Sequence, residues 1–92
     1  MAKIRMPRKG VTQAELADVL SRRLGREFEV VAAGQESVIA RRNPLSAVAV
    51  RITTIPGATV FRVRSVGVPV VSLGTARIVA DAIRRSPEFR SV

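Results

Sequence analysis

Basic side chains are the chemical groups that this 92-residue sequence concentrates. There are 16 lysines and arginines against 7 acidic residues, which gives a net charge of +9. One basic group falls within the first nine residues: Lys3, Arg5, Arg8 and Lys9. A second group alternates with apolar residues in a β-rich stretch: Arg51, Arg62 and Arg64. Both groups could bind phosphates or carboxylates, and a charge of this size favours contact with a polyanion, an acidic protein surface or an anionic membrane.

The charge also has an explanation that needs no ligand. Fourteen of the 16 basic residues are arginines, and a GC-rich genome alone would produce such a skew. A solvated basic surface keeps a protein soluble without binding anything. From the sequence we give the two explanations equal weight.

The residue types on which most enzymes rely are absent or isolated. The sequence has no cysteine and no histidine, which removes disulfides, thiolate metal sites and the usual general base. Glu15, Asp18 and Asp81 fall in helical patterns typical of surface residues. The six glycines are scattered and form no phosphate-binding loop. We therefore expect no enzymatic activity, no metal and no cofactor.

The second basic group lies on a predicted β-hairpin over residues 47–65. Two β-rich runs flank a turn at Pro56 and Gly57. Alternation assigns one side of the hairpin to the core: Val48, Val50, Ile52, Phe61 and Val63. The same alternation places Arg51, Arg62 and Arg64 on the opposite side. One face of the hairpin is therefore expected to be apolar and the other cationic.

Two helices accompany the predicted strands. Thr12 and Glu15 fit a capping box at the start of the first helix, and Gly25 suits the position that ends it. The last helix is expected over residues 73–85, with Ser72 as its N-cap. Its core stripe would contain Leu73, Ala76, Val79, Ala80 and Ile83. Ile78 and Ala82 widen this apolar arc, which is typical of a helix that is sandwiched in the fold or keeps a face for a partner.

These elements predict a single α+β domain in the order α-β-β-β-β-α. Its four strands form an antiparallel meander, with both helices packed on one face. The second strand, over residues 36–42, leaves its register open, since either Val38 and Ala40 or Ile39 could face the core. The domain proper is expected to span residues 11–86.

The two ends of the chain are expected to lie outside this domain. Residues 1–10 form a basic arm, either a disordered terminus or an edge strand through residues 3–6 that pairs with its own sheet or a neighbouring subunit. Residues 87–92 form a frayed tail, with Phe89 able to tuck against the fold.

Binding is the class of function that this pattern favours. We expect an assembly protein that self-associates or docks into a larger complex, for example a virion, tail or secretion-type assembly, with its basic face or arm toward an acidic partner. Four residues are candidates for a protein interface: Ile4, Met6, Ile78 and Ala82. The alternative is a non-specific nucleic-acid-binding protein that contacts phosphates, because Phe28 and Phe61 should face inward and cannot stack bases.

The expected location follows from hydropathy and from the absence of cysteine, which fits a cytosolic protein. No apolar run approaches the length of a membrane span, so we do not expect an integral membrane protein. We expect a cytoplasmic protein, or a virion-associated one if it is phage-encoded.

Overall fold

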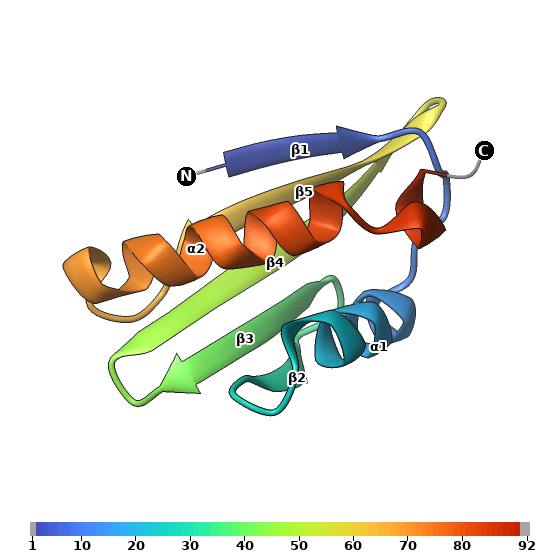
Figure 1. The fold of residues 1–92 in the computed structure, drawn as a ribbon. Coiled ribbons are helices and arrows are strands. Elements are labelled where there is room, and N and C mark those ends of the chain that lie inside the picture. The colour runs from blue at the N-terminus through green and yellow to red at the C-terminus, as the bar shows by residue number, and fades with distance from the viewer. Residues whose placement is uncertain (1, 91–92) are drawn as a thin grey trace.

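Figure 1 shows the fold as a computed structural model, which describes residues 2–90. Along the chain lie β1 (Ala2–Met6), α1 (Gln13–Leu24), β2 (Glu29–Ala33), β3 (Ser37–Asn43), β4 (Ser46–Ile55), β5 (Ala58–Ser65), α2 (Pro69–Arg84) and the 3-10 turn η1 (Pro87–Phe89). The strands form one antiparallel sheet in the order β1-β5-β4-β3-β2. The α+β class and the antiparallel sheet are as predicted, but the sheet has five strands rather than four.

The additional strand is the N-terminal segment. β1 pairs with β5 along its whole length, with Lys3 opposite Arg62 and Ile4 opposite Phe61. Ile4 and Met6 are each only 5% exposed and belong to the hydrophobic core. Burial of these two side chains offsets the conformational entropy that is lost when the segment becomes ordered. Residues 2–6 are therefore an edge strand of the domain's own sheet and not a disordered arm.

The central hairpin has the predicted facing. Val50 lies opposite Val63, and Ile52 lies opposite Phe61, across β4 and β5. All four side chains are buried. Gly57 takes a φ of 81° in the turn, a conformation that glycine adopts without steric cost.

The register of β3 is resolved. Val38 and Ala40 are fully buried, whereas Ile39 lies on the opposite face and is only half-buried. Val38 pairs with Val50 of β4, which is also fully buried. The buried neighbour strand thus selects the register in which both valines face the core.

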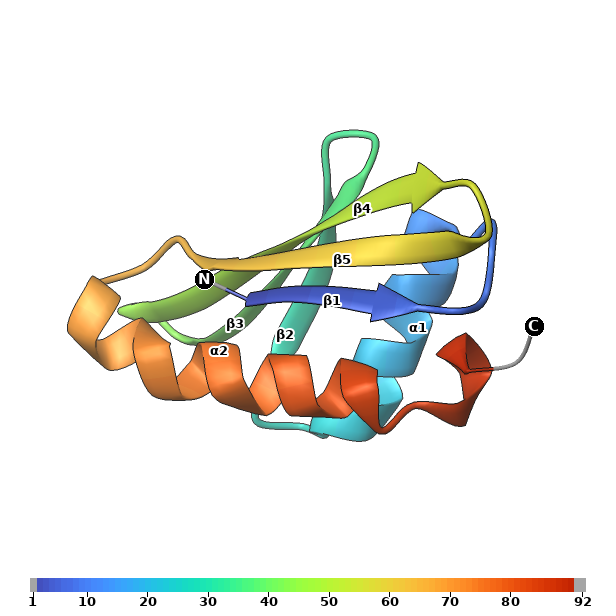
Figure 2. The same ribbon diagram turned by 90° about the horizontal axis from the view of Figure 1, so that it is seen from above.

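The helices supply the other half of the core. α1 packs against β2 and β3, α2 packs against β4, β5 and β1, and the two helices contact each other. In Figure 1 both helices lie in front of the strands, and Figure 2 shows α2 running below the sheet. Leu16 and Leu20 of α1 and Val79 and Ile83 of α2 are fully or almost fully buried in this layer.

α1 begins and ends as predicted. The backbone N–H of Glu15 donates to Thr12 Oγ1 at 3.1 Å, so Thr12 is the N-cap. The Glu15 carboxylate does not return to the helix start but pairs with Arg8. Gly25 follows the last helical residue with a φ of 77°, in the region that favours glycine.

α2 begins four residues earlier than predicted, at Pro69. Proline suits the first helical position, where no N–H is needed. Ser72 is therefore not the N-cap but a buried residue inside the helix, where its Oγ accepts from the Ala47 N–H at 3.3 Å. Ser72 and Thr75 form the inward face of these first turns, so Leu73 points outward and is 55% exposed. The prediction that Leu73 lies in the core was wrong.

The C-terminal residues close one end of the core. Phe89 is fully buried, and its ring centroid lies 5.0 Å from that of Phe61. The Arg8 N–H donates to the Phe89 carbonyl oxygen at 3.3 Å, which ties the turn η1 to the segment after β1. Residues 87–90 thus pack on the domain where a frayed tail was expected, and residues 91–92 lie outside the described residues.

Candidate functional site

Five basic residues gather on one surface of the sheet, which we call the basic sheet face: Lys3, Arg5, Arg51, Arg62 and Arg64. All five side chains are exposed. β1 contributes two of them, β5 two and β4 one. Each alternates along its strand with a core residue, so each points to the side opposite the core, as predicted for the three arginines.

Strand register aligns three of these charges in one row. Arg62 lies directly opposite Arg51 of β4 on one side and Lys3 of β1 on the other. Side chains that are directly opposite in an antiparallel pair have Cβ atoms about 4.5–5.5 Å apart. Like charges in such positions destabilise a sheet. The row is therefore a local cost to folding that the sequence retains.

A shallow depression lies beside this row. Its volume is about 500 Å³, and its lining includes Lys3, Arg51, Arg62 and Arg64. The small side chains of Ser37 and Ala49 also line it, between the longer basic ones. The face thus offers a hollow with four cationic groups around it, which suits an anionic group better than an apolar one.

Acidic neighbours of the basic sheet face are few. Arg51 lies 3.9 Å from Glu36, and both side chains are about two-thirds exposed, at 66% and 64%. Within residues 2–90, the structure contains no ion pair to Lys3, Arg5, Arg62 or Arg64. Four of the five charges are therefore uncompensated inside the domain.

Arg8, which was also predicted to contact a partner, is occupied within the domain. Its guanidinium pairs with Glu15 and donates to the Glu88 carbonyl oxygen at 3.0 Å. It therefore fastens α1 and the C-terminal turn to the segment after β1. Lys9, the fourth basic residue of the predicted arm, is exposed and lies after β1 rather than on the basic sheet face.

Glu88 is the acidic centre of a second internal cluster. Its carboxylate lies 3.2 Å from Arg23 and 3.4 Å from Arg22, both on α1. The backbone N–H of Glu88 is the largest cause that holds the pKa of this carboxyl below its ordinary value. Burial opposes it, and the guanidinium groups of Arg23 and then Arg22 lower the pKa further. Arg22 and Arg23 thus hold the C-terminal turn against α1.

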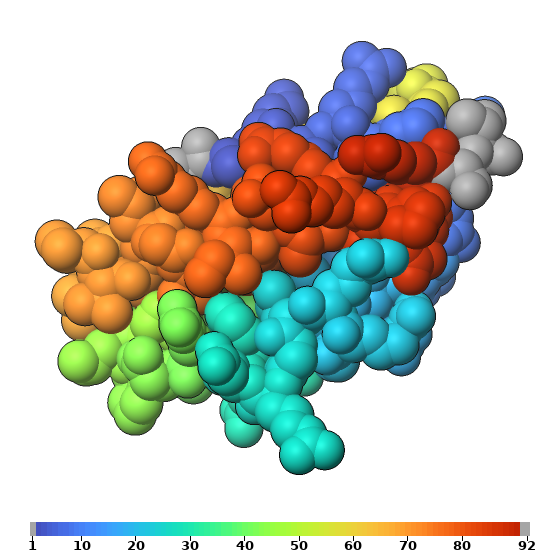
Figure 3. Space-filling model, in the orientation of Figure 1, coloured from blue at the N-terminus to red at the C-terminus, as the bar shows by residue number. Residues whose placement is uncertain are grey.

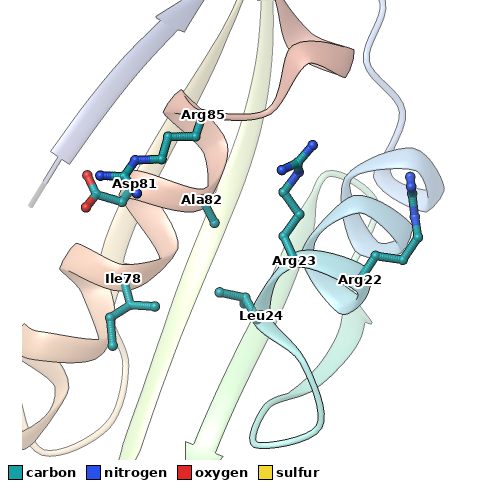
Figure 4. A pocket seen from close by; sticks show the side chains of 7 residues that line it. All are labelled: Arg22, Arg23, Leu24, Ile78, Asp81, Ala82 and Arg85. Atoms are coloured by element: carbon teal, nitrogen blue, oxygen red, sulfur yellow. The ribbon is translucent and has the colours of Figure 1, made fainter.

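The residues predicted to form a protein interface are separated by the fold. Ile4 and Met6 lie in the core, so they present no surface to a partner. Ile78 and Ala82 line a groove of about 660 Å³ between α1 and α2, with Leu24 on its other wall (Figure 4). Ile78 is 40% exposed, because α1 covers part of the wide apolar arc of α2.

One end of the molecule carries a cluster of exposed apolar residues that was not predicted, which we call the apolar end. It contains Leu45, Val66, Val68, Val70, Val71 and Leu73, with Val70 as much as 87% exposed. The Val68 N–H donates to the Leu45 carbonyl oxygen at 2.9 Å, and Figure 3 shows the start of α2 and the β3–β4 turn side by side at one end of the molecule. The available signal was the uncharged run over residues 65–76.

Comparison with models of known protein families, with curated proteins and with solved structures found no match. Across residues 2–90, no group of three or more acidic, histidine or cysteine side chains is placed to hold a metal ion. None of the helices described here is long and apolar enough to cross a membrane.

Proposed function

We propose that this domain is a binding protein that docks through its basic sheet face onto an acidic protein surface, as one component of a larger assembly. The observation that carries the proposal is the row of Lys3, Arg62 and Arg51, in which like charges stand opposite one another without acidic partners on Lys3 and Arg62. An anionic partner would supply the compensation that the domain itself does not provide.

The free and the bound domain differ in the energy of this row of charges. Each pair of directly opposed like charges disfavours the folded state by up to about 1 kcal/mol. A carboxylate that lies between two guanidinium groups reverses the sign of this interaction, and a hydrogen bond between charged groups contributes about 1.5–3 kcal/mol. An anionic group therefore gains more binding free energy at this row than at an isolated surface arginine.

The position of the helices leaves the basic sheet face accessible. Both helices cover the same face of the sheet, so the opposite face stays open for a partner. The row crosses three neighbouring strands, β4, β5 and β1, which lie roughly 4.8 Å apart. The three charges therefore extend over about 10 Å, which suits a cluster of acidic side chains on a folded surface.

Nucleic acid is the second candidate partner, because the same uncompensated guanidinium groups fit phosphates equally well. Base recognition is disfavoured. Phe61 and Phe89 are fully buried, and Phe28 is half-buried with the Arg42 guanidinium 5.9 Å above its ring. Such a protein would contact the phosphate backbone and discriminate little between sequences.

A matched pair of triple variants tests the proposal. Arg51→Gln/Arg62→Gln/Arg64→Gln removes three charges from the basic sheet face. The control, Arg77→Gln/Arg84→Gln/Arg85→Gln, removes the same charge from exposed positions at α2. Binding to polyglutamate and to generic duplex DNA is then measured by fluorescence anisotropy at several salt concentrations.

We expect the sheet-face variant to lose affinity for polyglutamate while the helix variant retains most of it. Equal losses in the two variants would show that net charge alone drives binding, and would contradict the proposal. Stronger wild-type binding to DNA, with a salt slope that falls by up to about 0.9 for each lost phosphate contact, would favour the nucleic-acid alternative.

A further inference from the structure

The two edges of the sheet differ in how they are protected. The strand order leaves the outer edges of β1 and β2 without a neighbouring strand. β1 carries Lys3 and Arg5, both exposed, and Pro7 follows it directly. Charged side chains and proline are the usual protection of an edge strand against pairing with another chain. The β1 edge is therefore protected against pairing with another strand.

The β2 edge lacks that protection. Its sequence, Glu-Val-Val-Ala-Ala, has one charged residue at the start and four small or β-branched apolar residues after it. Val31 is 44% exposed at the middle of the strand, and Ala32 is also exposed. Within residues 2–90, no hydrogen bond reaches the outer side of this strand. Such an apolar edge with unpaired backbone groups is a template for another strand.

We propose that β2 pairs with β2 of a second copy of this chain, antiparallel about a two-fold axis at Val31, to give one ten-stranded sheet. Two identical edges of this kind are self-complementary in their backbone hydrogen bonds, as an isologous interface requires. The pairing would also bring the two exposed Val31 side chains together on the open face of the sheet. Each Val31 already lies opposite the half-buried Ile39 within its own sheet.

The register follows from the length of the strand. Pairing centred on Val31 is the one register that engages all five residues of both strands, with Glu29 opposite Ala33 of the second copy. Because paired residues point to the same side, this register also keeps the open faces of both sheets on one surface.

The neighbouring helix leaves room for this approach. Gln13 marks the flank of α1 beside the β2–β3 turn, because its Nε2 donates to the carbonyl oxygens of Gly34 and Ser37 at 3.0 and 2.7 Å. Ala17 and Ser21 follow on the same flank at intervals of four residues. The charged residues Glu15 and Arg22 lie roughly 100–160° around the helix from these two. Asp18 lies nearer, roughly 60° around the helix from Ser21, so this flank of α1 has small side chains with one carboxylate at its border.

The dimer has a consequence that rests on the proposed function. In the ten-stranded sheet the two copies of β5 would be separated by seven strand intervals, or roughly 34 Å along a flat sheet. Both basic sheet faces would lie on the same surface. A long acidic partner could then contact both, and binding would gain from the linkage of two sites.

The oligomeric state of the full chain tests the inference without any acidic partner, so its failure is distinct from failure of the proposed function. Light scattering and sedimentation equilibrium are run up to about 1 mM, where even a dimer with a Kd near 1 mM is detectable. Val31→Lys sets two lysines opposite each other at the axis, whereas Val31→Thr keeps a β-branched residue there. Val70→Lys places the same charge on the apolar end.

We expect the wild type, Val31→Thr and Val70→Lys to form dimers, and Val31→Lys to be a folded monomer. A wild type that stays monomeric at the highest concentration overturns the inference. Loss of the dimer in Val70→Lys but not in Val31→Lys would place the interface at the apolar end and also overturn it.

Hydrogen exchange of the wild type gives a measurement that does not depend on variants. Alternate backbone amides of β2 should exchange more slowly as the protein concentration rises, because they become paired. Unchanged exchange across β2 in a concentration range where the protein dimerises would contradict the proposed pairing.

Discussion

Phe89→Ala removes the side chain that joins the C-terminal turn to the core. Phe89 is fully buried, and its ring lies against that of Phe61 with an interplanar angle of 42°. Truncation of a buried phenylalanine to alanine typically costs about 3–5 kcal/mol. Because Phe89 lies in the short turn η1, which can relax around the vacated space, we expect a loss near the lower limit, about 3 kcal/mol.

This loss should be large on the scale of the whole domain. Domains are stable by about 5–15 kcal/mol, so 3 kcal/mol is a fifth to more than half of the total. For a chain of this length, each 1 kcal/mol shifts the Tm by roughly 4–8 °C, which predicts a decrease of about 12–24 °C. Urea and thermal denaturation followed by circular dichroism measure both quantities.

Two further variants make the Phe89 measurement specific. Val70→Ala truncates a side chain that is 87% exposed, and it should leave the free energy of unfolding almost unchanged. In a double-mutant cycle, Phe61→Ala and Phe89→Ala should couple by about 0.5–1.5 kcal/mol, the value of an aromatic pair beyond its burial. A Phe89→Ala variant whose free energy of unfolding lies within about 0.5 kcal/mol of the wild-type value would contradict the burial of Phe89. A change that small is typical of a surface substitution.

Two other predictions concern the helix ends. Thr12→Ala should lower the free energy of unfolding by about 1 kcal/mol, because the Glu15 N–H loses its acceptor, and an unchanged urea midpoint would show that Thr12 does not cap α1. Glu88→Gln should be less stable than the wild type above the ordinary carboxyl pKa of 4.5, because the folded state lowers the pKa of Glu88 and so favours the charged form. The difference in free energy of unfolding between the two proteins should be lost as the pH falls from 4.5 through the lowered pKa. Denaturation curves that still show this difference below the lowered pKa would contradict the ionic role of Glu88.

Local patterns predicted the elements whose partners are adjacent in the chain. The alternation of Val48, Val50 and Ile52 correctly placed the core face of β4, and Thr12 correctly marked the start of α1. These features depend on strand pleat and on helix-end hydrogen bonds, which a short window of sequence contains.

Features that depend on distant partners were not predictable in the same way. The strand β1 exists because Ile4 and Met6 reach a core built by residues much later in the chain. Likewise, Ser72 and Thr75 of α2 turn inward because they meet the β3–β4 region, where Ser46 hydrogen-bonds to Thr75. The polar contact there displaces Leu73 to the surface, against its hydrophobic pattern.

The candidate site shows the same division. Alternation alone placed Arg51, Arg62 and Arg64 on one face. The addition of Lys3 to their row required the pairing of β1 with β5. Arg8 is not part of the site because its guanidinium contacts Glu15 and the Glu88 carbonyl oxygen. A local pattern of basic residues near the N-terminus could not predict these two contacts.

The most direct test of the basic sheet face is a map of backbone amide chemical shifts during titration with polyglutamate. The account predicts that the largest changes occur together at Lys3, Arg51, Arg62 and Arg64 and at the intervening Ala49. Residues of the same charge on α2, such as Arg84, should change little. Changes centred on α2 or on the apolar end, or spread evenly over all exposed arginines, would contradict a binding role for this face.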